Sequence, residues 1–354
     1  MIFFRKKSLK EKKAQNLKQA KKSWQKGESR VRHFPLVFYL EPTSVCNLFC
    51  PMCPVAMGVS EYQYSEKFLD LNLVDSLSEP LSYGLRCLLS GGGEPFLHPE
   101  FLTLAEKVKN QGLEAILNTN GTLIDSSLAR AIVELELDCL SFSIDAVEEE
   151  KYSRLRRGAQ LEQVRQAIFY LQEERRRQGK VKPYINMQFT LYQENYDQLP
   201  KVVDFASELG INHLVIEPLS PIFSFDPKYQ EFFQAQYLPP ENRLIEELKN
   251  LNKQAQAKGL IFSSHYLEEK EPINFPCPQP WINFGIRTNG RVFLCCGTAE
   301  NMGSIAEKDF STLWNGEKYR FVRERVAQNN YPDFCQLCLE EARSPKFNLE
   351  LIKG

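Results

Sequence analysis

The sequence has few histidines, no long apolar run and no internal repeat. Only four histidines occur among 354 residues, which disfavours zinc sites that combine cysteine with histidine. No run approaches the roughly 18 apolar residues of a membrane span, and no apolar signal segment follows the start. We therefore expect no transmembrane segment, and the length disfavours a small disulfide-stapled secreted domain.

The net charge of −1 hides an uneven distribution. Residues 1–32 hold twelve Lys/Arg and two acids, a local charge of +10, so the remaining chain carries −11. We predict a basic arm over residues 1–34 that is partly helical and largely a solvated extension. Leu9, Leu17, Ala20 and Trp24 form only a thin apolar stripe along it. Contact with RNA, an acidic membrane surface or an acidic partner is the alternative, although the acidic remainder argues against a large nucleic-acid surface.

Ten cysteines are many for a chain of this type, and reduced thiols indicate a reducing cytoplasm. Cys46, Cys50 and Cys53 are separated by three residues and then two. Three thiolates on such a loop can each bind a different iron of one cubane cluster, which leaves the fourth iron open. A structural zinc loop is the alternative, although zinc rarely uses this spacing.

Short apolar runs alternate with amphipathic helices from residue 36 onward. This pattern predicts a parallel sheet with right-handed crossovers, in an α/β fold with fewer strands than a closed eight-stranded barrel. Reactive groups in such folds lie at the carboxyl ends of strands, and the cysteine triplet follows the first strand. The predicted strands are Leu36–Leu40, Arg86–Leu89, Glu114–Asn118, Cys139–Ile144, Tyr184–Leu191 and Asn212–Glu217.

The chain divides by composition into five segments. A proline-rich connector with one helix precedes a region of short strands, turns and cysteines. The predicted segments are the arm 1–34, the barrel 35–220, the connector 221–276, a small cysteine-rich domain 277–345 and a tail 346–354.

Polar residues and glycines gather at the predicted strand ends. A glycine run after the second strand lets a ligand approach the backbone, and a glutamate there adds a charged acceptor. Each of these motifs alone is also consistent with a turn or a helix cap. The candidates for cofactor binding are Gly92, Gly93, Glu94, Asn120, Ser143, Asp145 and Arg156. No residue is singled out as catalytic.

The order and placement of these motifs resemble the radical S-adenosylmethionine (radical SAM) enzymes over roughly residues 35–217. The resemblance rests on the cysteine triplet, Gly92-Gly93-Glu94-Pro95 and Ser143-x-Asp145. It implies a partial (β/α)6 TIM-like barrel and a [4Fe-4S] cluster whose open iron is chelated by the methionine part of SAM.

The same resemblance implies roles for individual residues. Gly92, Gly93 and Glu94 would contact the methionyl amine, and Ser143 and Asp145 would lie near the ribose. Asn120, Arg156 and Gln188 are further candidates carried over by resemblance.

A second group of cysteines lies near the C-terminus. Cys335 and Cys338 form a knuckle, Cys277 precedes them, and only one of the neighbours Cys295 and Cys296 can face a common site. Four thiolates would complete a closed site, and by spacing alone structural zinc is as good a candidate as iron.

Resemblance favours iron for this second site. The region is similar to the SPASM or twitch extensions of radical SAM enzymes, and its cysteine count suits the shorter twitch form with one auxiliary [4Fe-4S] cluster. The spacing resembles the carbinol dehydrogenase of 2-deoxystreptamine antibiotic synthesis and favours Cys295 over Cys296. The implied ligands are Cys277, Cys295, Cys335 and Cys338.

These resemblances imply an oxidoreductase or maturase that cleaves SAM reductively. The resulting 5′-deoxyadenosyl radical would abstract hydrogen from a peptide or small molecule, for oxidation or cross-linking. A reduced flavodoxin- or ferredoxin-type donor would supply the electron. Alternatives are carbohydrate or cyclitol alcohol dehydrogenation, RNA modification and a non-catalytic iron-sulfur or zinc scaffold.

Overall fold

The fold is taken from a computed structural model of the chain. It describes residues 8–59, 64–224, 226–268, 276–295, 300–335, 338 and 351. Cys296, one of the two candidates for the second site, lies outside the described residues.

One curved sheet organises the described chain, in the strand order β10-β9-β8-β1-β2-β3-β4-β5-β6-β7. The strands from β8 to β7 in this order run parallel, whereas β9 and β10 are antiparallel additions at one edge. The strand bounds are β1 (Val37–Leu40), β2 (Arg86–Leu88), β3 (Glu114–Thr119), β4 (Cys139–Ser143), β5 (Tyr184–Leu191), β6 (His213–Pro218), β7 (Ile261–Ser264), β8 (Asn283–Ile286), β9 (Arg291–Phe293) and β10 (Asn301–Ser304).

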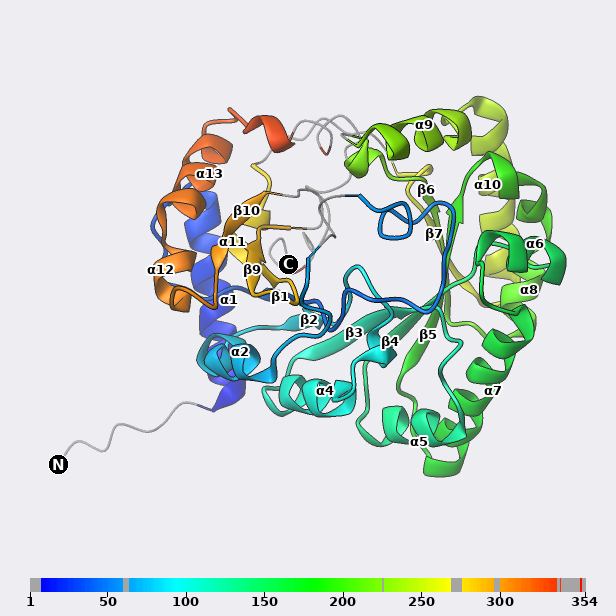
Figure 1. The fold of residues 1–354 in the computed structure, drawn as a ribbon, viewed down its shortest axis with the longest axis horizontal. Helices are drawn as coiled ribbons and strands as arrows, with labels where there is room; N and C mark the ends of the chain where they lie inside the picture. The colour runs from blue at the N-terminus through cyan, green and yellow to red at the C-terminus, as the bar shows by residue number, and fades with distance from the viewer. Residues whose placement is uncertain are drawn as a thin grey trace.

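Helices cover the outer side of the curve (Figure 1). They follow the strands as the crossovers of a parallel sheet require. Their bounds are α2 (Leu71–Ser76), α3 (Ser78–Leu81), α4 (Phe101–Asn110), α5 (Ser126–Glu134), α6 (Glu149–Leu155), α7 (Leu161–Gln178), α8 (Val202–Glu208), α9 (Pro227–Gln236) and α10 (Asn242–Ala257).

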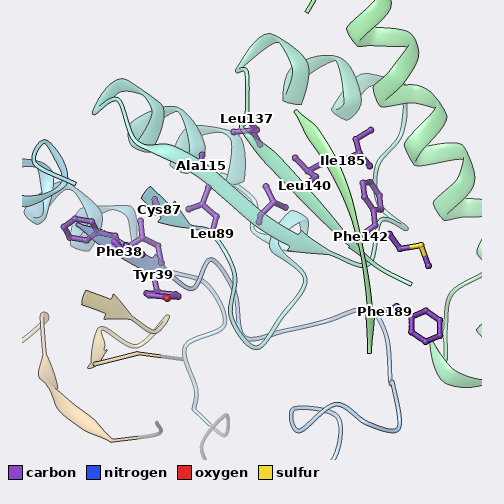
Figure 2. Close-up of a cluster of buried hydrophobic side chains, with 14 of the residues drawn as sticks. Phe38, Tyr39, Cys87, Leu89, Ala115, Leu137, Leu140, Phe142, Ile185 and Phe189 are labelled. Carbon is purple, nitrogen blue, oxygen red and sulfur yellow. The ribbon is translucent and has the colours of Figure 1, made fainter. Parts of the chain in front are cut away.

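The core lies between these helices and the sheet. Figure 2 shows buried side chains from successive strands, among them Phe38, Cys87, Ala115 and Leu140, each fully buried. Residues of β4 and β6 alternate between buried and half-buried positions. Because side chains alternate across a strand, the sheet has one closed face toward the helices and one more accessible inner face.

The six predicted strands are confirmed, with ends that differ by at most one residue. The segment between β5 and β6 begins as a 3-10 helix, Gln193–Lys201, and continues as α8. The prediction of a connector with a single helix is wrong, because residues 221–276 also contain α9 and the strand β7. β7 pairs in parallel with β6 and so extends the barrel by one strand.

The cysteine-rich C-terminal region is built onto the same sheet. β8 pairs in parallel with β1, from Val37 beside Asn283 to Leu40 beside Ile286. β8 and β9 form an antiparallel hairpin, and Gly290 takes a positive φ of 76° in its turn. Three further helices complete this side: α11 (Gln279–Ile282), α12 (Phe310–Trp314) and α13 (Glu317–Ala327).

The prediction that the basic arm is a solvated extension is wrong for its described part. Residues 9–25 form helix α1 (Leu9–Gln25), which begins with a capping box between Ser8 and Glu11. Trp24 is 6% exposed, and its indole N–H donates to the carbonyl of Pro276 at 2.8 Å. The helix therefore packs against the start of the C-terminal region, as Figure 1 also shows.

Polar residues complete this packing, which explains why a thin apolar stripe understated it. The side chain of Asn16 donates to the carbonyls of Phe34 and Tyr83 and accepts from the N–H of Phe34. Lys13 donates to the carbonyl of Gly112 at 2.7 Å. Contact of the arm with RNA, a membrane or an acidic partner stays a prediction.

Among the described helices, none is long and apolar enough to cross a membrane.

Candidate functional site

The cysteine triplet lies on the loop after β1, at the carboxyl edge of the sheet. Cys50 is 5% exposed, and Cys46 and Cys53 are partly buried. Three donors approach the sulfurs. The backbone N–H of Leu48 lies 3.4 Å from Cys46 Sγ, Asn120 Nδ2 lies 3.9 Å from the same sulfur, and Arg156 lies 3.9 Å from Cys50 Sγ. Donors of this kind stabilise negative charge on sulfur.

The electrostatics of these thiols favour a bound cation. Burial, together with the nearby Glu94, Cys50 and Cys53, raises the pKa of the Cys46 thiol to about 11. Burial also raises the pKa of Cys50, and the nearby Arg156 opposes this rise. Cys46 and Cys50 would therefore resist ionisation alone, and iron cations are the natural source of compensating charge. The residues therefore fit the cluster that the spacing predicts.

A single metal ion is a different matter. Within the described ranges, no three His, Cys, Asp or Glu side chains form a group that could hold one ion. A cubane does not require such convergence, because each thiolate binds a different iron.

The glycine turn after β2 packs directly against the chain that leads into the cysteine loop. The N–H of Gly93 donates to the carbonyl of Thr43 at 3.0 Å, and the N–H of Glu94 donates to the carbonyl of Val45 at 2.9 Å. A Cβ on Gly93 would lie 2.2 Å from the Val45 carbonyl oxygen. Only glycine permits this approach, which brings the turn beside the loop.

Glu94 is a buried carboxylate beside the cysteine loop, 3% exposed. It accepts hydrogen bonds from Thr119 Oγ1 at 2.7 Å and from the Asn120 N–H at 2.8 Å. Burial raises the pKa of Glu94 to about 7, and the two hydrogen bonds oppose the rise. A carboxylate that is poised near neutrality can accept a hydrogen bond from a ligand ammonium group.

Asp145 and Arg156 form a buried ion pair at the carboxyl end of β4. Arg156 Nη2 lies 2.5 Å from Asp145 Oδ2, and the N–H of Thr190 donates to Asp145 Oδ1 at 2.9 Å. Burial alone would lower the pKa of Arg156, but Asp145 and Cys50 raise it above its ordinary value. Arg156 therefore links the cysteine loop to the ends of β4 and β5 as a fixed positive charge.

The other predicted cofactor residues lie at the same edge. Asn120 holds the cysteine loop, because its side-chain N–H also donates to Asn47 Oδ1 at 2.9 Å. Ser143 is half-buried at the end of β4 and is paired in register with Gln188 of β5. The structure thus brings all seven predicted residues to the carboxyl edge, while their binding roles stay predictions.

Three C-terminal cysteines lie around Tyr331. The Cys277 N–H donates to the hydroxyl of Tyr331 at 3.1 Å, and burial raises the pKa of this tyrosine with Cys277, Cys335 and Cys338 nearby. Burial and the neighbouring Cys338 raise the pKa of Cys335 to about 12.

The fourth predicted ligand is placed on a different element. Cys295 follows β9 and is 8% exposed. Since Cys296 lies outside the described residues, the preference for Cys295 stays a prediction.

Sequence reasoning named Gln188 by resemblance but did not single out Glu217 and His265, which lie beside it, or Glu41 at the same edge. Gln188 donates to Glu217 at 2.6 Å, and His265, just after β7, lies 3.6 Å from Glu217. Glu41, just after β1, is fully buried and bonded to the glycine turn. Their placement at strand ends was the available signal, but it is shared with many other residues.

Comparison with known proteins places these features in a family. Residues 40–206 match the model of the radical SAM superfamily, and residues 277–339 match SPASM, an iron-sulfur cluster-binding domain. The chain therefore belongs to the radical SAM superfamily and carries a C-terminal SPASM domain. This family brings a [4Fe-4S] cluster and SAM, and SPASM domains bring auxiliary iron-sulfur clusters.

Two relatives illustrate the range of similar sequences. The tungsten-containing aldehyde ferredoxin oxidoreductase cofactor-modifying protein of Pyrococcus furiosus is 26% identical over 328 residues, covering 86% of this chain and 87% of that protein. The GTP 3′,8-cyclase of Chlorobaculum tepidum is 33% identical over 128 residues, covering 36% of this chain and 38% of that protein.

Solved structures support the fold. Streptococcus suis SuiB bound to its precursor peptide SuiA has a TM-score of 0.64 at 15% identity, covering 94% of this chain and 78% of SuiB. Native anSMEcpe with bound AdoMet has a TM-score of 0.61 at 19% identity, covering 90% of this chain and 98% of that chain. At these identities the likeness concerns the fold alone.

Proposed function

We propose that this chain cleaves SAM reductively and that the resulting radical abstracts hydrogen from a peptide. The observation that carries the proposal is the meeting of three thiols, the glycine turn and the Asp145–Arg156 pair at one edge of a radical SAM barrel. When bound, a [4Fe-4S] cluster supplies the electron that converts SAM into methionine and a 5′-deoxyadenosyl radical.

The chain's own residues would bind and orient the reactants. Cys46, Cys50 and Cys53 would hold the cluster, and Glu94 would accept a hydrogen bond from the methionyl amine. The Asp145–Arg156 pair would fix the wall beside the ribose. These groups are largely buried, which excludes water from a reactive radical.

The carboxyl ends of β4 to β7 offer hydrogen-bonding groups to a substrate. Ser143, Gln188 and Glu217 come from the adjacent strands β4, β5 and β6, and His265 follows β7. Phe49 of the cysteine loop is 69% exposed, and its backbone N–H donates to the carbonyl of Arg157 at 2.9 Å. A polyamide with mixed polar and apolar side chains suits such a surface. SuiB and anSMEcpe, which share the fold, were each solved with a peptide.

The SPASM region would accept an electron from the substrate or orient it. Cys277, Cys335, Cys338 and Cys295 would hold one auxiliary cluster. A reduced flavodoxin- or ferredoxin-type protein would be the donor for the first cluster.

A second candidate substrate is an enzyme cofactor. The relative from Pyrococcus furiosus aligns over 86% of this chain, across both matched domains, and its name describes a cofactor-modifying protein.

The experiment is anaerobic incubation of the reconstituted chain with reductant and SAM. We expect 5′-deoxyadenosine and methionine from the wild type and no 5′-deoxyadenosine from Cys50→Ala. Cys87→Ala is the matched control, since Cys87 is a fully buried thiol in β2 and should retain the activity. A loaded cluster that yields no 5′-deoxyadenosine would refute the proposal.

Deuterated extracts would then separate the substrate classes. Peptide fractions and cofactor-containing protein fractions from cells grown in heavy water are added separately. Deuterium in 5′-deoxyadenosine with the peptide fraction supports the first candidate. Deuterium only with the cofactor fraction supports the second.

A further inference from the structure

Glu41 is a fully buried carboxylate that joins three parts of the molecule. It follows β1 directly and is 0% exposed. Its Oε1 accepts from the N–H of Gly92 at 2.6 Å and faces Arg287 Nη1 at 3.3 Å. Its Oε2 accepts from the N–H of Thr288 at 3.2 Å and from the hydroxyl of Tyr64. A buried carboxylate with this many donors is strongly held in place.

The first part is the glycine turn. A Cβ on Gly91 would lie 2.2 Å from Glu41 Cγ and 2.5 Å from Glu41 Oε1. The turn therefore rests on the glutamate side chain, and the Gly92 N–H is fixed by it. Displacement of Glu41 would change the conformation of Gly91–Gly93, which leads into Glu94.

The second part is the hairpin of the SPASM side. Arg287 is 8% exposed and compensates the charge of Glu41. Its guanidinium also lies over the ring of Phe293, 4.7 Å from the ring centroid. Phe293 ends β9, two residues before Cys295. β9 is joined to the barrel through β8, which lies beside β1 (Figure 1).

The third part is the segment 64–68, which comes after the cysteine loop. Besides donating through the Tyr64 hydroxyl, this segment accepts hydrogen bonds through its backbone from two threonines near Glu41. One is Thr288, whose N–H donates to Glu41, and the other is Thr43, two positions after Glu41. The carbonyl of Glu66 accepts from Thr288 Oγ1 at 2.6 Å, and the carbonyl of Lys67 accepts from Thr43 Oγ1 at 2.7 Å. This segment, the glycine turn and the hairpin thus share one buried charged centre.

We propose that Glu41 is a positioning residue that couples SAM binding at the glycine turn to the SPASM hairpin. The inference rests on the proposed function, because it takes the glycine turn as the SAM site. Because the glycine turn and the SPASM hairpin both contact Glu41, the free energy of binding at one site depends on the state of the other. This coupling is reciprocal. Removing the charge of Glu41 weakens its ion pair with the buried Arg287 and releases both turns at once.

The test is the SAM affinity of the cluster-loaded full chain without reductant, so that SAM is bound but not cleaved, measured by anaerobic equilibrium dialysis. Glu41→Gln should weaken SAM binding about tenfold, because one charged centre no longer orders the turn. Asp138→Asn is the matched control. Asp138 is also a buried carboxylate, bonded to Lys109 at 2.6 Å and to the Ala115 N–H at 2.9 Å, but it lies at the opposite end of β4. Its affinity for SAM should stay within about twofold of the wild type.

Coupling is separated from a general structural effect by a double-mutant cycle. Arg287→Met alone should also weaken SAM binding. When Arg287→Met is combined with Glu41→Gln, the SAM affinity should fall by less than about a further twofold, because the two side chains act as one unit. If the fold-changes in SAM affinity of the two single variants multiply in the double variant, the coupling is overturned. SAM affinity within twofold of wild type in both single variants would also overturn it. Iron content of each variant is measured in parallel, which identifies loss of the clusters.

A second variant tests the same carboxylate if the first is unfolded. If Glu41→Gln does not fold, Tyr64→Phe removes one hydroxyl from the same carboxylate and should still weaken SAM binding by about twofold to threefold. Unchanged affinity in that variant would overturn the inference. If the wild type itself does not bind SAM, the proposed function fails. If it binds SAM and Glu41 has no effect, only this inference fails.

Discussion

Glu94 offers a test in which stability and function change in opposite directions. Burial raises the pKa of this carboxyl to about 7 from its ordinary value of 4.5. Between these values the folded protein keeps a proton that the unfolded chain releases, so wild-type stability falls as the pH rises through this window. Glu94→Gln cannot ionise and escapes this loss. From pH 5.5 to pH 8, the free energy of unfolding of the variant should rise by about 2 kcal/mol relative to that of the wild type.

The assay is the thermal unfolding midpoint of the anaerobic, cluster-loaded protein at both pH values. A change of about 2 kcal/mol corresponds to a shift of roughly 3 °C for a chain of this size. The same substitution removes the carboxylate acceptor for the methionyl amine, so SAM should bind at least about tenfold more weakly. Glu100→Gln, an exposed glutamate six residues away, should change neither quantity. A midpoint difference independent of pH would refute the reasoning about burial, and unchanged SAM affinity would refute the binding role.

Three further predictions concern the arm, a buried histidine and the second cluster. Burial lowers the pKa of His33 to about 4, so wild type loses stability as the pH falls below about 6.5. His33→Gln should recover about 2 kcal/mol at pH 5 relative to pH 7, and equal midpoint differences at both pH values would contradict this. Trp24→Ala should cost about 3–5 kcal/mol of unfolding free energy in denaturant titrations, whereas the exposed Lys18→Ala should be nearly neutral. A neutral Trp24→Ala would mean that α1 does not dock in solution. Cys335→Ala should lower the iron content to about four per chain while SAM still changes the cluster spectrum. Iron content equal to that of wild type would remove Cys335 from the ligand set.

Much of the fold could be predicted because its signals are local. Apolar runs alternate with amphipathic helices, and this pattern located the ends of β1 to β6 to within one residue. The cysteine triplet and the Gly92-Gly93-Glu94 turn are short motifs whose chemistry depends on spacing. The parallel sheet then brings the strand ends to one edge, so the candidate site follows from topology.

The remaining features depend on contacts between residues far apart in the sequence. Asn16 and Trp24 of α1 find their partners on Phe34, Tyr83 and Pro276, and the charge of the arm gave no sign of this docking. Short strands such as β7 and β8 are recognisable only from the neighbours with which they pair.

Some ion pairs also join residues far apart in the sequence, so they could not be predicted from it. Glu41 meets Arg287 across 246 positions in the chain. Glu217 and His265 meet because β6 and β7 are adjacent in the sheet. No periodicity or spacing reports such pairs.

The most direct test is the electron paramagnetic resonance spectrum of the reduced chain carrying Cys335→Ala, before and after addition of SAM. Metal analysis of the same sample counts iron and zinc. The account predicts about four irons per chain and a cubane spectrum that changes when SAM binds its open iron. Zinc at Cys46, Cys50 and Cys53, or a cubane spectrum that SAM leaves unchanged, would contradict it.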